Sequence, residues 1–279
     1  MKAILLLGGN GLIGSKLKET FKSNYNIDIF NIDKKDVDLS LFSNRDLIKE
    51  RINKIKPEAT IVLASIKRQH GDNYAIKKHN DAITENVSMC LSEKESKVIY
   101  ISSCAVYGEK NNQIEFNESS ILSPTSSYGE HKLKSENTYK KFIDKKRLLI
   151  IRPPLIYDMD EINGYHPGGF LHSAIKNKII KLWGSGNEKR EFILLRDAVN
   201  IIIKLTLLDA RGIYNIASGE SYSYRDIAEY IKKKFNCKIF ERERTGIPVD
   251  HSYNNEKLMK LIKKYNFTDP YQAVDNYIN

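Results

Sequence analysis

The segment SSYGEHK at residues 126–132 contains the two side chains of the chain best suited to chemistry. Tyr128 precedes Lys132 by four residues, and side chains four residues apart on a helix lie on the same face. A tyrosine whose pKa is about 10 is a poor base at neutral pH, but a nearby ammonium stabilises the phenolate and lowers that pKa. The spacing therefore predicts a pair that exchanges a proton with a hydroxyl or carbonyl group of a substrate.

A second pattern is the glycine turn LLLGGNGLIG at residues 5–14, which ends a predicted strand and begins a predicted helix. Gly8, Gly11 and Gly14 are spaced three residues apart. In such turns one glycine permits the tight bend, another lets the backbone approach a pyrophosphate, and the third lets helix pack on strand. The helix N-terminus adds N–H groups and partial positive charge. The turn predicts a dinucleotide site that also includes Leu12 and Ile13.

The acidic residue Asp33 follows the second predicted strand in the segment FNIDKKDVDLS. It stands about 20 residues after the glycines, where a carboxylate would accept hydrogen bonds from the adenosine ribose hydroxyls. This position favours NAD. Lys34 and Lys35 follow directly and could instead pair with the 2′-phosphate of NADP, so that cofactor stays open. The alternative is that this segment is a turn with ordinary charged residues and takes no part in cofactor binding.

Apolar strands alternate with amphipathic helices through the first half of the chain. The expected strands are 3–9, 26–33, 59–65, 97–103 and 147–154, and the expected helices are 14–23, 41–56, 81–94 and 128–144. Such alternation predicts an α/β protein with a Rossmann-type, doubly wound parallel sheet and helices on both faces.

The pattern loosens after about residue 153, where PPLIYDMDEINGYHPGG has the proline and glycine content of loops. We therefore expect a dinucleotide-binding domain at residues 1–153, with part of 190–212 returning to it. Residues 154–279 are expected to form mainly a smaller substrate-binding lobe at the carboxyl ends of the strands, where such sheets bind ligands.

Composition limits the classes of partner. The net charge of +10 arises from lysines and arginines spread among acidic residues, which suits solvated helix faces and an anionic small substrate better than nucleic acid. Three scattered cysteines without a CxxC pair argue against a structural metal and suit a reducing compartment. No apolar run approaches the roughly 18–20 residues of a membrane span, and the opening MKAILLL reads as a buried strand, so a cytoplasmic protein without a membrane partner is expected.

Four segments together, GGNGLIG, VLAS, ISSCAVYG and SSYGEHK, resemble the extended short-chain dehydrogenase/reductase family of nucleotide-sugar epimerases, dehydratases and 4-ketoreductases. The later segments IIRPPLIY, WGSGNEKREFILLRDAV and GIYNIASGESYSYRDIAEYI extend the resemblance over nearly the whole chain. The resemblance implies an NAD(P)-dependent enzyme with a nucleotide-sugar substrate, and a homodimer formed through a helical bundle.

The resemblance also implies roles for individual residues. Ser103 would hydrogen-bond the reacting oxygen, Tyr128 would exchange its proton, and Lys132 would hold the nicotinamide ribose; Ser102 is the neighbour that could be confused with Ser103. Arg190 in GNEKREF would bind the substrate pyrophosphate through paired hydrogen bonds. Further cofactor contacts implied are Asp38, Leu39, Leu63, Ala64, Ser65, Lys67, Asn80 and Pro154. A packing role, or a surface salt bridge for Arg190, is the alternative.

Departures from the family pattern narrow the expected reaction. Cys104 and Ala105 stand where 4,6-dehydratases have Asp-Glu, which disfavours water elimination. Aligned on Tyr107, the catalytic cysteine of GDP-fucose synthases would fall at Ala105, which disfavours double epimerisation. Leu155 replaces an asparagine that contacts substrate in many epimerases, and the lobe is short for the family.

Oxidation or reduction at C4 of a nucleotide-linked hexose is therefore expected, with a 4-ketoreductase favoured and a 4-epimerase as the alternative. A non-catalytic dinucleotide sensor on the same fold is the alternative from another class, because a fold alone does not fix function. The presence of the serine, the tyrosine and the lysine argues against the sensor.

Overall fold

The computed structural model describes residues 1–66, 71–108 and 113–278, which form two compact units. The first unit comprises Met1–Gly108, Ile121–Arg152 and Val199–Tyr214 within those limits. The described part of the second unit comprises residues 113–120, 153–198 and 215–278. How cofactor and substrate binding divide between the two units stays a prediction.

The first unit contains a six-stranded sheet in the order β11-β6-β4-β3-β1-β2. Its strands are β1 (Ala3–Leu7), β2 (Asp28–Ile32), β3 (Ala59–Val62), β4 (Lys97–Ile101), β6 (Leu148–Arg152) and β11 (Gly212–Asn215). The pairs β1–β2, β1–β3, β3–β4 and β4–β6 are all parallel. β3, β4 and β6 are buried along their whole length, as expected of central strands covered on both faces, whereas β2 at the edge is partly exposed.

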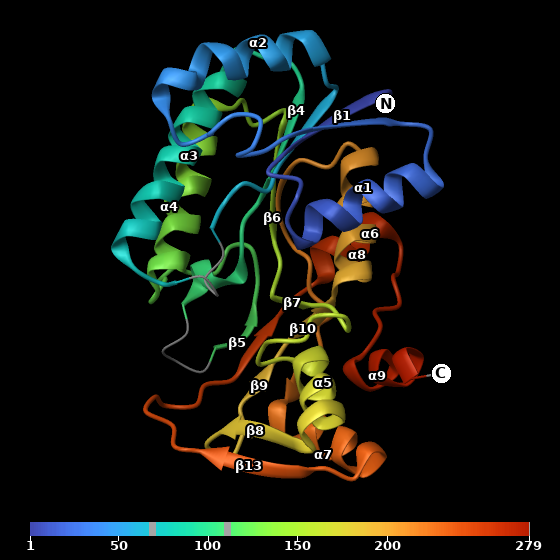
Figure 1. Ribbon diagram of the computed structural model, residues 1–279. Coiled ribbons are helices and arrows are strands. Elements are labelled where there is room, and N and C mark those ends of the chain that lie inside the picture. Colours follow the sequence, from blue (N-terminus) through green and yellow to red (C-terminus); the bar gives the residue numbers. More distant parts are fainter. Residues whose placement is uncertain (67–70, 109–112, 279) are drawn as a thin grey trace. The chain divides into compact units, whose positions relative to one another are not determined.

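Helices cover both faces of this sheet: Figure 1 shows α2, α3 and α4 on one face and α1 and α6 on the other. Their bounds are α1 (Leu12–Asn24), α2 (Arg45–Ile55), α3 (Tyr74–Ser92), α4 (Ser127–Phe142) and α6 (Leu195–Leu207). The predicted Rossmann-type fold is confirmed. The helix expected at 81–94 begins at Tyr74 instead, because the Asn73 side chain caps it by accepting the Ile76 N–H at 3.0 Å.

The second unit is built from short strand pairs and helices around an aromatic core. The pairs are β5 (Gln113–Phe116) with β14 (His251–Tyr253), β7 (Leu155–Tyr157) with β10 (Phe192–Leu194), β8 (Ile179–Trp183) with β13 (Lys238–Arg242), and β9 (Lys189–Arg190) with β12 (Tyr222–Ser223). The helices are α5 (Pro167–Asn177), α7 (Tyr224–Phe235), α8 (Glu256–Ile262) and α9 (Pro270–Ile278). Among the described residues of the chain, no helix is both long and apolar enough to cross a membrane.

A buried ion pair fixes α4 to the sheet of the first unit. Arg152, at the end of β6, donates to both carboxylate oxygens of Glu136 at 2.8 and 2.7 Å, and the two side chains are 1% and 0% exposed. Ser102, at the end of β4, donates to the same carboxylate at 2.7 Å. Because Glu136 follows Lys132 and Tyr128 by one and two helical turns, this pair sets where that face of α4 meets the sheet.

Replacing Glu136 with leucine should lower the free energy of unfolding by about 3–5 kcal/mol, because the Arg152 guanidinium stays buried without its carboxylate. Urea unfolding measures this change. Glu130→Gln is the control, since Glu130 is exposed and lies 3.8 Å from Lys77, so its loss should cost less than about 1 kcal/mol. Equal losses in the two variants would contradict the role given to the buried pair.

Candidate active site

The glycine turn lies where the strand order reverses, because β2 and β3 flank β1 on opposite sides. Gly8 has a φ of +82°, and a Cβ there would lie 2.6 Å from the Ala64 Cα, so the ends of β1 and β3 approach closely only because this residue is glycine. A Cβ at Gly14 would lie 2.5 Å from the Gly9 Cα. At Gly11 a Cβ would meet no atom of the described residues within 4 Å, so among these residues nothing covers this part of the turn.

The N-terminus of α1 can accept an anion. Gly11 is its N-cap and offers no side-chain oxygen, and the first turn, which includes the half-buried Leu12 and Ile13, contains no acidic residue. The first N–H groups of the helix and its positive end therefore meet no competing carboxylate within this helix. The cradle around Gly8, Gly11 and Gly14 fits the pyrophosphate of a dinucleotide.

Asp33 is tied to this turn through two asparagines. Its carboxylate accepts hydrogen bonds from the side-chain amide of Asn10 and, at 3.1 Å, from that of Asn31. Asn31 also accepts the Gly9 N–H at 2.8 Å, so it links the end of β2 to the glycine turn. No local pattern indicated Asn10 or Asn31, because asparagines are ordinary in turns and only the pairing of β1 with β2 brings them together.

Lys34 and the loop that follows Asp33 make contacts of their own, apart from the glycine turn. Lys34 is exposed, and its Nζ lies 3.8 Å from Asp38 Oδ2. Hydrogen bonds from Ser40 hold the pKa of Asp38 below its usual value. Leu39 packs into the hydrophobic core of the first unit, and its carbonyl accepts a hydrogen bond from Asn86 at 3.1 Å. The loop thus offers a carboxylate and backbone groups to a ligand, while the Leu39 side chain serves packing.

The segment after β3 is held by Asn80, which is 1% exposed. The Asn80 amide accepts the Ile66 N–H at 2.7 Å and donates to the Ile66 carbonyl at 3.1 Å. These two hydrogen bonds fix the Ile66 backbone. They therefore also help to position the half-buried residues that directly precede it, Leu63, Ala64 and Ser65. Lys67, also predicted as a cofactor contact, lies outside the described residues.

Lys132 is buried at the carboxyl end of β4, with 4% of its surface exposed. Its Nζ donates to the Ile101 carbonyl at 2.9 Å and lies 3.5 Å from the Ser65 hydroxyl. The ammonium is also 5.5 Å from the centroid of the Tyr128 ring and 5.0 Å from that of Tyr100. Burial disfavours the charged form and lowers the pKa of Lys132 to about 7. Near neutral pH, this lysine is therefore charged in part of the molecules and neutral in the rest.

Ser103 caps the short 3₁₀ helix η3 (Cys104–Tyr107), its hydroxyl accepting the Ala105 N–H at 3.1 Å. A Cβ at Gly129 would lie 2.6 Å from the Ala105 carbonyl oxygen, so the first turn of α4 packs directly on the turn after Ser103. Ser102, by contrast, is 2% exposed and bonded to Glu136. The structure thus places Ser103, and not Ser102, among the groups able to face a ligand.

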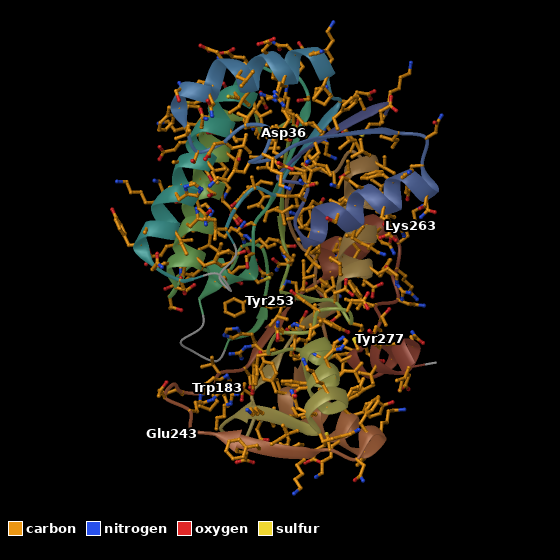
Figure 2. All side chains as sticks on the ribbon, in the orientation of Figure 1. Asp36, Trp183, Glu243, Tyr253, Lys263 and Tyr277 are labelled. Carbon is orange, nitrogen blue, oxygen red and sulfur yellow. The ribbon has the colours of Figure 1, made fainter. Side chains whose placement is uncertain are left out.

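Two predicted residues lie in the second unit. Pro154 is half-buried, and Arg190 is in β9, where one of its nitrogens donates to the Lys189 carbonyl at 3.1 Å. The second unit also has an open cavity of about 380 Å³, whose lining includes Trp183, Lys181, Arg242, Lys176, His172 and Asn163. Trp183, labelled in Figure 2, lies 5.2 Å from the Arg242 guanidinium. The sequence analysis missed this cavity, although the alternation in IIKLW could have indicated the outward Lys181 and Trp183.

The model of the NAD dependent epimerase/dehydratase family matches residues 4–217, and the chain belongs to this family. The resemblance predicted from the sequence is confirmed, as is the prediction of an enzyme that depends on a nicotinamide dinucleotide.

Two curated relatives differ in extent. The chain is 32% identical to the dTDP-4-dehydro-6-deoxyglucose reductase of Escherichia coli over 151 residues, which cover 51% of this chain and 46% of the relative. It is 25% identical over 279 residues to a putative UDP-glucose 4-epimerase of Methanocaldococcus jannaschii, with 87% of each chain covered. The first match thus spans about half the length of the reductase.

Solved structures share the fold over the whole chain. The UDP-glucose 4-epimerase of Thermus thermophilus, in complex with NAD, has a TM-score of 0.81 at 18% identity and covers 99% of each chain. The dTDP-4-dehydrorhamnose reductase of Bacillus anthracis, in complex with NADP, has a TM-score of 0.78 at 18% identity, covering 100% of this chain and 99% of that one. At these identities the likeness shows the fold.

Binding of NADH should depend on pH through Lys132. If the ammonium donates to the nicotinamide ribose, binding raises the lysine pKa from about 7, so the complex takes up a proton at higher pH. The Kd for NADH should be constant below pH about 7 and rise by up to about tenfold per pH unit above it. Fluorescence titration between pH 6 and 9 measures this dependence, and Lys132→Met should abolish it. A rise that persists in Lys132→Met would rule out this lysine as its source.

Proposed function

We propose that the protein is an NAD-dependent oxidoreductase that reduces a C4 carbonyl of a nucleotide-linked hexose, as a 4-ketoreductase. The observation that carries this proposal is the buried Lys132 ammonium, 5.5 Å from the Tyr128 ring and 3.5 Å from the Ser65 hydroxyl. Ser65 follows Ala64, the residue that Gly8 approaches. Tyr128 and Lys132 therefore lie at the same strand ends as the glycine turn, which fits a pyrophosphate.

The side chains divide the chemistry between them. When bound, the nicotinamide would supply the hydride to the carbonyl carbon. Tyr128 would then give its hydroxyl proton to the carbonyl oxygen, and the Lys132 ammonium would stabilise the phenolate that remains. Ser103 would donate a hydrogen bond to the same oxygen, stabilising the charge that develops there.

Reduction is favoured over epimerisation by one position of the second unit. Leu155 packs against the hydrophobic core of that unit and has no polar group to offer a rotating keto-sugar. The 32% identity with the Escherichia coli reductase points the same way, although that match covers 51% of the chain. A 4-epimerase is the second candidate, supported by the relative of which 87% is covered.

The cavity of the second unit suits the nucleotide part of such a substrate. A base can stack on the exposed Trp183 ring, beside Lys181 and Arg242. Arg190 stays the proposed partner of the pyrophosphate, since its guanidinium is half-exposed and forms one hydrogen bond with a neighbouring carbonyl.

Tyr128→Phe should lower kcat by at least about 100-fold while the Kd for NADH stays within about twofold, because only the proton donor is lost. Oxidation of NADH with a panel of 4-keto nucleotide-sugars measures the rate. Tyr139→Phe is the matched control: it is the same substitution on the same helix, and the buried Tyr139 hydroxyl has no hydrogen-bond partner among the described residues. If Tyr128→Phe kept more than about a tenth of the wild-type rate, the role of Tyr128 would be wrong.

The cofactor preference should depend on Asp33. We expect calorimetry to show tighter binding of NADH than of NADPH, and Asp33→Ala to weaken NADH binding about tenfold or more, since hydrogen bonds to a charged group contribute about 1.5–3 kcal/mol. Asp28→Ala, at the exposed start of the same strand, is the control and should change neither affinity. A wild-type preference for NADPH would assign the selection to Lys34 and Lys35.

A further inference from the structure

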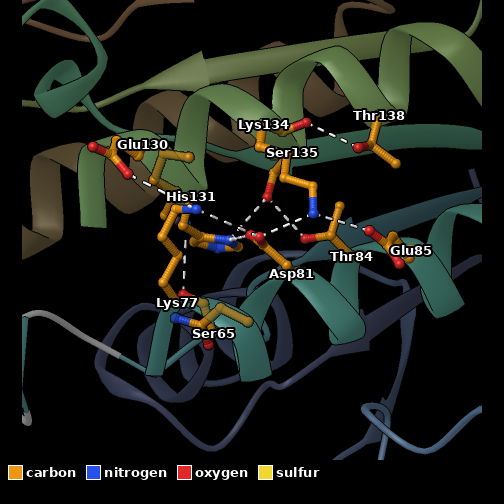
Figure 3. A network of polar contacts seen from close by, with 12 residues as sticks. Ser65, Lys77, Asp81, Thr84, Glu85, Glu130, His131, Lys134, Ser135 and Thr138 are labelled. Atoms are coloured by element: carbon orange, nitrogen blue, oxygen red, sulfur yellow. Dashed lines mark hydrogen bonds and ion pairs between the residues drawn. The ribbon is translucent and has the colours of Figure 1, made fainter. Parts of the chain in front are cut away.

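A buried histidine and aspartate connect the helix of the reactive pair to its neighbour. His131, on α4, is 1% exposed, and its Nδ1 lies 2.9 Å from Oδ1 of Asp81 on α3, which is 8% exposed (Figure 3). Burial alone would raise the pKa of Asp81, but hydrogen bonds from His131 and Lys134 hold it below its usual value. An ionised carboxylate only accepts hydrogen bonds, so Nδ1 of His131 carries the proton and donates it.

These two residues belong to a closed ring of contacts in the first unit, in which three peptide bonds alternate with three side-chain contacts. In order, the ring contains Lys132, Ser65, Ile66, Asn80, Asp81 and His131. Besides the contact between the histidine and the aspartate, it contains the 3.5 Å approach of Lys132 Nζ to Ser65 and the double hydrogen bond between Asn80 and Ile66. The ring therefore joins the cofactor segment after β3, helix α3 and helix α4.

We propose that His131 is a positioning residue, which fixes through Asp81 the segment of α4 that carries Lys132 and so keeps its ammonium buried beside the dinucleotide site. The inference rests on the proposed function in one respect: that function gives Lys132 its role beside the cofactor. Among the described residues, Nζ of Lys132 makes one short hydrogen bond, to the Ile101 carbonyl, so its burial depends on where the helix lies. A small displacement of α4 would admit water to the ammonium.

The other groups around His131 either balance Asp81 or tie the same helices. The charged groups that act on His131 are Asp81 and Lys77 on α3 and Lys132 on α4. Around them, Lys134 pairs with Asp81 and Glu85, and Lys77 lies near Asp81 and Glu130. Burial lowers the pKa of His131 below its ordinary value, so the imidazole is neutral at pH 7. One helical turn further along α4, the hydroxyl of Ser135 lies 2.8 Å from that of Thr84, which joins the two helices, and 3.3 Å from Nδ1 of His131.

Three variants separate positioning from ordinary packing. His131→Leu removes the donor to Asp81 and opens the ring. His131→Asn keeps an N–H donor near the place of Nδ1 and should preserve the ring. Thr84→Val removes the buried hydrogen bond to Ser135 and serves as the control, because it loosens the same helix pair while every residue of the ring keeps its side chain.

The pKa of Lys132 is the readout, followed through its ¹³Cε resonance in lysine-labelled protein and assigned by the loss of that signal in Lys132→Met. We expect titration near pH 7 in the wild type, His131→Asn and Thr84→Val, and a rise of at least about one pKa unit, tenfold in the protonation equilibrium, in His131→Leu. An unchanged pKa in His131→Leu, or an equal rise in Thr84→Val or His131→Asn, would overturn the proposal. If His131→Leu does not fold, His131→Ser replaces it with the same expectation.

Affinity for NADH at pH 6, where the lysine is charged in every variant, gives the second readout. His131→Leu should raise the Kd about tenfold, and the other two variants should stay within about twofold of the wild type. Equal affinity in all four proteins would also overturn the proposal. Absence of NADH and NADPH binding by the wild type would contradict the proposed function, while the pKa comparison would still decide the role of His131.

Discussion

The burial of the Lys132 ammonium is the constraint on which the rest of the site depends. Removal from water disfavours the charge and brings the pKa to about 7, while the Ile101 carbonyl at 2.9 Å and two tyrosine rings favour retention of the proton. Because its pKa is close to neutral pH, the protonation state of this lysine changes strongly when a new partner comes near. A ribose hydroxyl or a phenolate placed beside it would favour the charged form, so cofactor binding and proton transfer both act on the same group.

The position of α4 determines whether this balance holds. The Glu136–Arg152 pair ties the helix to the ends of β4 and β6, and the Asp81–His131 pair ties it to α3. Gly129 allows its first turn to pack on η3. Burying a charged group costs desolvation, so neither contact contributes much net stability when complete, yet leaving one buried partner unsatisfied is expensive. Such contacts therefore hold α4 in one position more than they stabilise the fold as a whole.

Much of the first unit could be predicted because local signals agree there. Continuous apolar runs indicated the central strands, and the glycine spacing indicated the turn whose close approach to Ala64 requires Gly8. Other features depend on contacts between distant residues. Nothing local pairs Asp81 with His131, fifty positions later, or separates Ser102 from Ser103 before the contact with Glu136 is known. Likewise, β5 pairs with β14 and belongs to the second unit, although it lies between segments of the first.

The proposed reaction consumes one NADH for each C4 carbonyl that is reduced, whereas an epimerase returns the hydride to the sugar. The most direct measurement incubates the protein with dTDP- or UDP-linked 4-keto-hexoses and NADH that carries deuterium at both C4 positions of its dihydronicotinamide ring. NMR spectroscopy of the product should show one deuterium at C4 of the sugar for each NADH oxidised. Interconversion of nucleotide hexoses without oxidation of NADH, or a reduced sugar without deuterium at C4, would contradict the account.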